Sequence, residues 1–119
     1  MDGFEEVIKF LSENIEGAVF AGIIGKDGLP VAVEAKEIMD KAEGSAEIAN
    51  IYNTIIRACN TLKVGTLQEF FVNTDQLGFF GIPVLEDYFL VLAMHTPANI
   101  GRARLEIRRM LPKIEEMMK

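Results

Sequence analysis

The sequence predicts an α/β domain of the α+β kind, in which a five-stranded antiparallel sheet is covered by helices on both faces. Its 119 residues fit a single domain spanning residues 1–119. Segments with helical and strand periodicity follow one another in the order α-β-β-α-β-β-β-α, with short connections. The strands AVFAGII and FLVLAM have no polar side, so both faces of the sheet must be covered. We expect the central helix on one face and the other two helices on the opposite face.

A helix and a β-hairpin are predicted for the first part of the chain. Residues 3–15 carry one apolar stripe at helical spacing, formed by Phe4, Val7, Ile8, Leu11 and Ile15. The strands Gly17–Gly25 and Leu29–Ala35 flank Asp27-Gly28, a pair typical of tight hairpin turns. Pro30 has no amide hydrogen to donate, so the second strand is expected at an edge of the sheet.

The central helix, a three-stranded meander and a last helix are predicted next. The central helix is expected over residues 45–63, with Ser45 in its start region and Val64-Gly65 after its end. Three strands are expected at Thr66–Thr74, Gly78–Val84 and Tyr88–His95, and the short links between them favour hairpins. Residues 99–119 are expected to be helical, with a kink or a restart at Pro112.

Composition and charge exclude several classes of function. The formal net charge of −6 argues against nucleic-acid binding, because phosphates repel an acidic protein. Only residues 98–119, with six basic and three acidic side chains, weaken that argument. The longest uncharged apolar run, Gly17–Gly25, is too short for a membrane span, and the acidic start does not resemble a signal peptide. A single cysteine, Cys59, rules out an intrachain disulfide, so a reducing cytoplasmic location is expected.

The side chains that most catalysis requires are scarce. Any nucleophile–base pair would have to use the single histidine, His95, and Cys59 is expected to be a small core residue of the central helix. One cysteine and one histidine do not supply a zinc site. The segment GIIGKDG lacks the spacing of a phosphate-binding loop. Glu69 lies within an apolar strand and is expected to face solvent or an interface. We therefore predict no enzyme, no catalytic residue, no cofactor and no metal.

The central helix has an unusual surface. Its apolar side chains cover an arc of roughly 180°, wider than the stripe of an ordinary surface helix. The opposite face holds only one charge and is otherwise made of asparagine and threonine, which are poor helix formers. This face is either a neutral solvent face or, as we predict, a partner-binding surface made of Asn50, Asn53, Thr54, Arg57, Asn60 and Thr61.

Two further surfaces stand out in the second half of the chain. The strand TLQEFFVNT is apolar on both sides and is expected at the free edge of the sheet opposite Pro30. Such an edge is an aggregation hazard unless it is paired, and a second copy of the chain could pair with it. The last helix carries Arg102, Arg104, Arg108 and Arg109, which fit either a solvated face or a contact with an acidic partner or a phosphate.

The chain resembles the Roadblock/dynein light-chain family. The matching stretches are GAVFAGIIGKDGLPVAV, GTLQEFFVNTD and FLVLAMHTPANIGRARLEIRRML, and the match is weakest beyond Leu111 because Pro112 interrupts the last helix. The resemblance implies a profilin-like fold with strand order 2-1-5-4-3. It also implies dimers that join their sheets through the third strand and pair their central helices. The dimer interface carried over by position consists of Ile48, Ile51, Tyr52, Ile55, Cys59, Leu67, Glu69, Phe71 and Asn73.

The resemblance also implies a function. Prokaryotic members of the family resemble regulators of small Ras-like GTPases, and the GTPase binds a surface of the dimer that includes the central helices. A homodimer that regulates a small GTPase without chemistry of its own is therefore the first hypothesis. The alternatives are a scaffold or light-chain-like subunit of a larger assembly, and a small-ligand sensor. For the sensor, Gly22, Gly78 and Gly81 leave room beside the sheet, although close packing of the backbone explains them as well.

Overall fold

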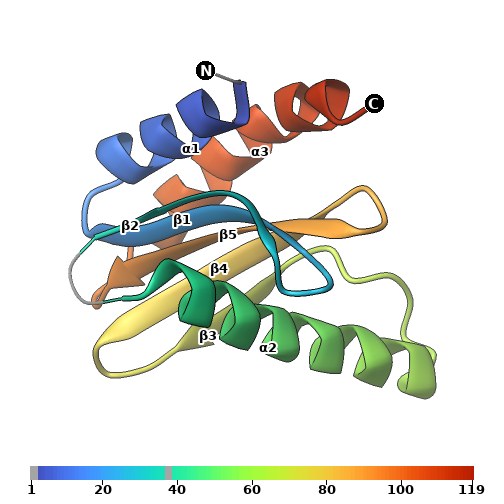
Figure 1. Cartoon of the computed structure of the whole chain (residues 1–119). Helices are drawn as coiled ribbons and strands as arrows, with labels where there is room; N and C mark the ends of the chain where they lie inside the picture. Colours follow the sequence, from blue (N-terminus) through green and yellow to red (C-terminus); the bar gives the residue numbers. More distant parts are fainter. Residues whose placement is uncertain (1–2, 37–38) are drawn as a thin grey trace.

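The computed structural model describes residues 3–36 and 39–119, and within them three helices and five strands follow one another in the predicted order (Figure 1). The elements are α1 (Gly3–Asn14), β1 (Ala18–Gly25), β2 (Pro30–Ala35), α2 (Lys41–Leu62), β3 (Phe70–Asn73), β4 (Leu77–Val84), β5 (Tyr88–His95) and α3 (Ile100–Met117). The strands form one antiparallel sheet with the order β2-β1-β5-β4-β3. The profilin-like strand order that the resemblance implied is confirmed.

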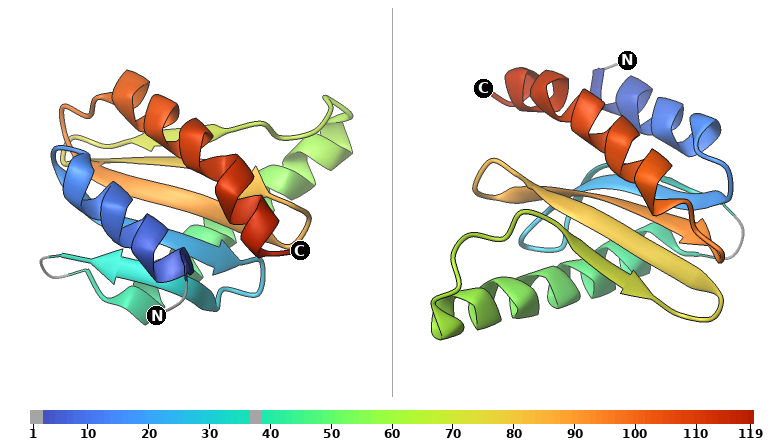
Figure 2. Two further views of the ribbon diagram at one scale, coloured as in Figure 1. Left: turned by 90° about the horizontal axis from the view of Figure 1, so that it is seen from above. Right: turned by 180° about the vertical axis from the view of Figure 1, so that it is seen from behind.

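The sheet has a hydrophobic core on each face. Figures 1 and 2 show α1 and α3 lying together on one face and α2 on the other, as predicted. Successive side chains of a strand point to opposite faces, so β5 supplies both cores. Leu90, Leu92 and Met94 pack under α1 and α3, whereas Phe89, Val91 and Ala93 pack under α2. This is why the segment FLVLAM carries no polar side.

The turns and helix starts follow local backbone chemistry. Gly28 has φ +87°, and the Asp27 carboxylate accepts a hydrogen bond from the Leu29 amide at 3.0 Å, so the predicted hairpin turn is confirmed. The start of α2 was predicted too late. Asp40 caps the helix by accepting a hydrogen bond from the Glu43 amide at 2.8 Å, and α2 therefore begins four residues before Ser45.

Two other boundaries differ from the prediction. β3 begins at Phe70 rather than Thr66, so Leu67 and Glu69 lie in the connection that precedes the strand. The pairing with β4 runs only from Phe70 opposite Gly81 to Asn73 opposite Gly78, although β4 itself continues to Val84. α3 continues through Pro112 as one helix, without the restart that was considered.

Candidate functional site

α2 is fully buried against the sheet only as far as Tyr52, and beyond it Ile55 and Ile56 pack partly against the same core. Its buried residues, Ser45, Ile48, Ala49 and Tyr52, all precede Asn53. Farther along, Ile55 and Ile56 are half-buried, while Leu62 is 69% exposed and Val64, just after the helix, is 68% exposed. The last turns of α2 extend past the strands (Figures 1 and 2). The wide apolar arc of the sequence is thus divided between the subunit's own core and an uncovered surface.

The buried part of α2 is held by aromatic packing. The ring of Tyr52 stacks on that of Phe89 with a centroid distance of 4.4 Å, and Phe70 approaches it at 6.0 Å. Burial raises the pKa of the Tyr52 phenol above its usual value. Tyr52 is 1% exposed and Ile48 4%. These two predicted interface residues therefore offer little surface to a partner, in contrast to their neighbours Ile51 and Ile55.

The asparagine and threonine face of α2 divides into two kinds of residue. Asn53 donates a hydrogen bond from its side chain to the Lys26 carbonyl at 2.8 Å, so it ties α2 to the β1–β2 turn. The Thr54 hydroxyl donates to the Asn50 carbonyl one turn back, also at 2.8 Å. The exposed side chains that remain open to solvent on this face are those of Asn50, Arg57, Asn60 and Thr61. Sequence reasoning grouped all six and did not separate Asn53 as a structural contact.

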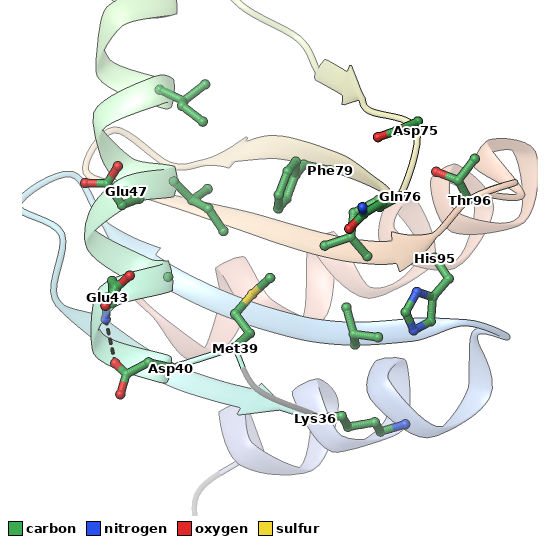
Figure 3. Close-up of a pocket in the computed structure, with 15 residues that line it drawn as sticks. Lys36, Met39, Asp40, Glu43, Glu47, Asp75, Gln76, Phe79, His95 and Thr96 are labelled. Carbon is green, nitrogen blue, oxygen red and sulfur yellow. Dashed lines mark hydrogen bonds between the residues drawn. The ribbon is translucent and has the colours of Figure 1, made fainter.

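A groove lies beside the first half of α2, between this helix and the β3–β4 turn (Figure 3). Its volume is about 750 Å³. Val19, Ile48, Ile51, Leu77 and Phe79 give it an apolar lining, and Asp40, Glu43, Glu47 and Asp75 give it acidic side chains. In Figure 3, Glu43 and Glu47 project from α2 on one side, and Asp75 and Gln76 lie across from them with Phe79 between. The groove exists because α2 leaves the β4 side of the sheet face uncovered.

The edge strand β3 is the second uncovered surface. It is the last strand of the sheet on its side and pairs only with β4 among the described residues. Phe70 is buried toward α2, whereas Phe71 is 43% exposed and Asn73 is exposed. The unpaired edge and Phe71 together form a surface that a further strand could extend.

Glu69 is placed by two arginines of α3 rather than by strand pairing. Arg104 binds its carboxylate at 2.9 Å and Arg108 at 3.3 Å. The hydrogen bond from Arg104 is the main cause that lowers the pKa of Glu69, although partial burial opposes it, and the same bond raises the pKa of Arg104. Glu106, which is 5% exposed, is held in the same way by Arg109 at 3.1 Å and Arg102 at 4.0 Å. All four arginines thus contact a glutamate.

The space beside the glycines of the sheet is filled by the chain itself. A Cβ atom on Gly81 would lie 2.4 Å from the Phe70 ring, and one on Gly22 would lie 2.8 Å from Val33. One on Gly78 would lie 3.0 Å from the Phe71 ring. Close packing therefore accounts for these glycines, and they do not leave room for a ligand.

The described residues hold neither a membrane-spanning helix nor a cluster of metal-ligating side chains. Among them, no helix is long and apolar enough to cross a membrane. No group of three or more metal-ligating side chains comes together in that part of the chain. Cys59 lies farther along α2 than the groove, is partly exposed and lines a smaller hollow with Tyr52 and Leu67, so it is not a buried core residue as expected.

Comparison with known proteins fixes the family. No protein-family model and no curated protein matches the sequence. Among solved structures, MglC from Myxococcus xanthus is 32% identical, with 95% of this chain and 97% of that chain covered and a TM-score of 0.69. A Roadblock/LC7 domain from Streptomyces avermitilis reaches a TM-score of 0.88 at 14% identity, with 98% of both chains covered. The chain belongs to the Roadblock/dynein light-chain family.

The profilin-like character of this Roadblock chain is also borne out. Profilin IA from Acanthamoeba castellanii superimposes over 98% of this chain and 100% of that chain, with a TM-score of 0.64 at 15% identity. At this identity the likeness concerns the fold alone.

Proposed function

We propose that this Roadblock protein is a non-enzymatic interaction module of the cytoplasm, which forms a homodimer and in that form binds and regulates a small Ras-like GTPase. The observation that carries the proposal is the incomplete burial of α2. A helix that leaves Ile51 and Leu62 exposed and Ile55 only half-buried is stabilised when a partner covers these side chains. The family resemblance makes a second copy of the chain the first such partner.

The groove beside α2 and the end of α2 complement each other. The groove is apolar with acidic side chains, and the end of α2 carries the exposed Leu62 and Val64 next to Arg57 and Lys63. Two copies related by a two-fold axis can therefore place the end of each α2 in the groove of the other. Full burial of a leucine or valine side chain contributes about 1.5–3 kcal/mol, and a symmetric contact does so twice. Glu43 and Glu47 of one copy then face the basic end of the other, which favours antiparallel helices.

The β3 edge fits the same arrangement. Pairing of β3 with β3 of the second copy satisfies the free backbone groups of the edge and removes the aggregation hazard of the strand. Phe71 and Asn73 lie on this edge, and Leu67 and Glu69 lie just before it. The proposed dimer interface thus consists of the exposed part of α2, including Cys59, together with β3 and the residues before it.

The proposed GTPase surface is the polar face of the two α2 helices. Asn50, Arg57, Asn60 and Thr61 are exposed there, with Thr54 beside them, and amides and hydroxyls can bond to a partner without the desolvation cost of charged groups. Asn53 contributes through the position it gives to α2 rather than through a free side chain. Such a surface would act by contact on the GTPase switch regions, since no catalytic group accompanies it in the described residues.

Light scattering on the purified protein at micromolar concentration tests the dimer. At about 500 mM NaCl, which screens contacts between exposed charges, we expect twice the protomer mass of 13.2 kDa, and the protomer mass for Ile55→Asp and for Phe71→Asp. The matched control is Leu29→Asp, because Leu29 is 67% exposed and lies in the β1–β2 turn, toward the β2 edge of the sheet and opposite the β3 edge. A monomeric wild-type protein, or a mass that neither interface substitution changes, would contradict the proposed dimer.

Binding assays with the Ras-like GTPases of the same cell test the regulatory role. Each GTPase is loaded with GDP or a GTP analogue and mixed with the dimer, and GTP hydrolysis and nucleotide release are then measured. We expect one nucleotide state to bind better, and Asn50→Ala, on the exposed polar face, to weaken that binding while the mass of the dimer stays unchanged. The absence of both binding and a rate effect would sink the GTPase role, and a stable complex with other proteins would then favour the scaffold.

A further inference from the structure

The outer face of α1 and α3 carries two strips of opposite charge. The two helices lie beside each other on the side of the sheet away from α2 (Figure 2). Residues 5–16, in α1 and just after it, expose four glutamates and one lysine, namely Glu5, Glu6, Glu13, Glu16 and Lys9. Residues 102–113 of α3 expose five basic side chains, Arg102, Arg104, Arg108, Arg109 and Lys113. The basic strip contrasts with the net charge of −6 of the whole chain.

The arginines of this face are positioned but not neutralised. Glu69 is shared by Arg104 and Arg108, and Glu106 is shared by Arg102 and Arg109. One carboxylate for two guanidinium groups leaves a positive charge on each cluster. Each guanidinium also has five N–H donors, more than these contacts use. The two clusters therefore keep unused guanidinium N–H donors, which can bind the carboxylates of an acidic partner.

Each strip also exposes one large apolar side chain. Phe10 of α1 is 38% exposed, and Leu105 of α3 is 48% exposed. Phe10 is flanked at helical spacing by Glu6 and Glu13, and Leu105 is flanked by Arg102, Arg108 and Arg109. An apolar side chain surrounded by charges of one sign matches an apolar side chain surrounded by charges of the other sign.

We propose that this α1–α3 face is a second self-association surface, on which α1 of one copy packs against α3 of another. Because the acidic and basic strips lie next to each other, a two-fold axis between them brings each strip against its opposite in the second copy. Phe10 of each copy then meets Leu105 of the other. The occupant of the face is thus another copy of this chain, and both contacts form in one symmetric interface.

This contact is separate from the proposed dimer through α2 and β3, which lies on the other side and at the edge of the sheet. A chain that uses both surfaces assembles beyond a dimer, with four protomers as the smallest closed form. Exposed ion pairs are each weak and are screened by salt. The α1–α3 contact therefore responds to salt more strongly than the apolar α2 contact.

Sedimentation velocity at about 20 mM and about 500 mM NaCl, over a range of protein concentrations, measures the contact. The decisive variant is Glu6→Lys with Glu13→Lys, which reverses the acidic strip at exposed positions. We expect it to halve the low-salt mass and to remove the salt dependence. Adding Arg102→Glu, Arg108→Glu and Lys113→Glu to the same chain reverses both strips and restores the mass, while Arg104 still holds Glu69 and Arg109 still holds Glu106. The Ile55→Asp variant keeps the native α1–α3 face but lacks the α2 contact. We expect it to form a pair of protomers at low salt that separates at high salt.

A matched control and a second readout keep the outcomes apart. Glu86→Lys with Asp87→Lys changes the net charge equally in the β4–β5 turn and leaves the low-salt mass unchanged. Chains with Phe10→Cys or Leu105→Cys, each also carrying Cys59→Ser, are mixed and treated with a short bismaleimide. Each chain has one thiol, so a link between the two kinds of chain reports the contact between copies, and Leu29→Cys in place of Leu105→Cys gives the background. No preferential link, together with a mass that neither salt nor the charge reversal changes, overturns the proposal, whatever happens to the α2 dimer.

Discussion

Gly81 is the position at which a single methyl group tests the packing beneath the candidate site. An added Cβ would lie 2.4 Å and 2.6 Å from two atoms of the Phe70 ring and 3.1 Å from the Leu90 carbonyl oxygen. Carbon atoms in contact stay about 3.5–4.0 Å apart, so in Gly81→Ala the ring must retreat by about 1 Å. Phe70 is 7% exposed and its ring lies 6.0 Å from that of Tyr52, so little free space receives it. Overpacking of this kind costs about 1–3 kcal/mol.

Urea unfolding and thermal melting, both at one fixed protomer concentration, measure this cost. For a domain of this size each kcal/mol lowers Tm by roughly 3–6 °C. The shift of Phe70 also displaces the start of β3, so a weaker proposed dimer is expected in light scattering. The double variant with Phe70→Leu relieves the contact and should be more stable than the sum of the single effects.

The matched control for this substitution is Gly101→Ala. A Cβ there meets only the Asn99 side chain at 3.7 Å, and alanine is a better helix former by about 1 kcal/mol, so stability is kept or raised. A Gly81→Ala protein as stable as the wild type would refute the assignment of this glycine to close packing against Phe70.

Three further predictions concern single contacts. Asp40→Ala removes the cap of α2 and should lower the free energy of unfolding by about 1 kcal/mol in urea, with Asp40→Asn close to wild type. Asn53→Ala removes the bond to the Lys26 carbonyl, and a loss of about 0.5–1.5 kcal/mol with faster amide exchange in the β1–β2 turn is expected. Glu69 has a lowered pKa in the folded state, so its ion pairs stabilise the fold fully above the ordinary glutamate pKa and lose this effect as the pH falls below it. Urea unfolding at neutral and acid pH should therefore show Glu69→Gln less stable than wild type at neutral pH and equal to it in acid.

The fold followed from the sequence because its signals are local. The alternation in β5, the Asp27-Gly28 turn and the apolar stripe of α1 each reflect the periodicity of one element. The start of α2 was also marked locally, by Asp40 three residues before Glu43, which is the spacing of a helix cap. That signal was present in the sequence and was overlooked in favour of Ser45.

The candidate site was less predictable because its contacts are long-range. Glu69 and Arg104 are 35 residues apart, and no periodic pattern links them. The start of β3 at Phe70 is set by where its pairing with β4 begins, and no pattern within the segment Thr66–Glu69 marks that position. Likewise, the apolar arc of α2 gives the width of the buried surface but not how much of it the subunit covers. Only the packing separates Tyr52, which is in the core, from Leu62, which is not.

Because α2 is only partly buried by its own subunit, the stability of this helix is expected to depend on self-association. Up to Tyr52 it is fixed by Ile48 and Tyr52 in the core, whereas beyond Tyr52 only Ile55 and Ile56 pack partly against that core. Short helical segments are marginal in water, so in an isolated protomer the turns beyond Ile55 should open far more often than those around Tyr52.

In the proposed dimer the second copy covers these turns and stabilises them in proportion to the logarithm of its concentration. Hydrogen exchange at a series of protein concentrations separates the two cases. Protection of residues 55–62 should rise with concentration in the wild type and stay low in Phe71→Asp, while protection of residues 45–52 changes little. Equal protection of both halves at nanomolar concentration would show that α2 is stable without a partner, and the incomplete burial of this helix would then no longer support the proposed dimer.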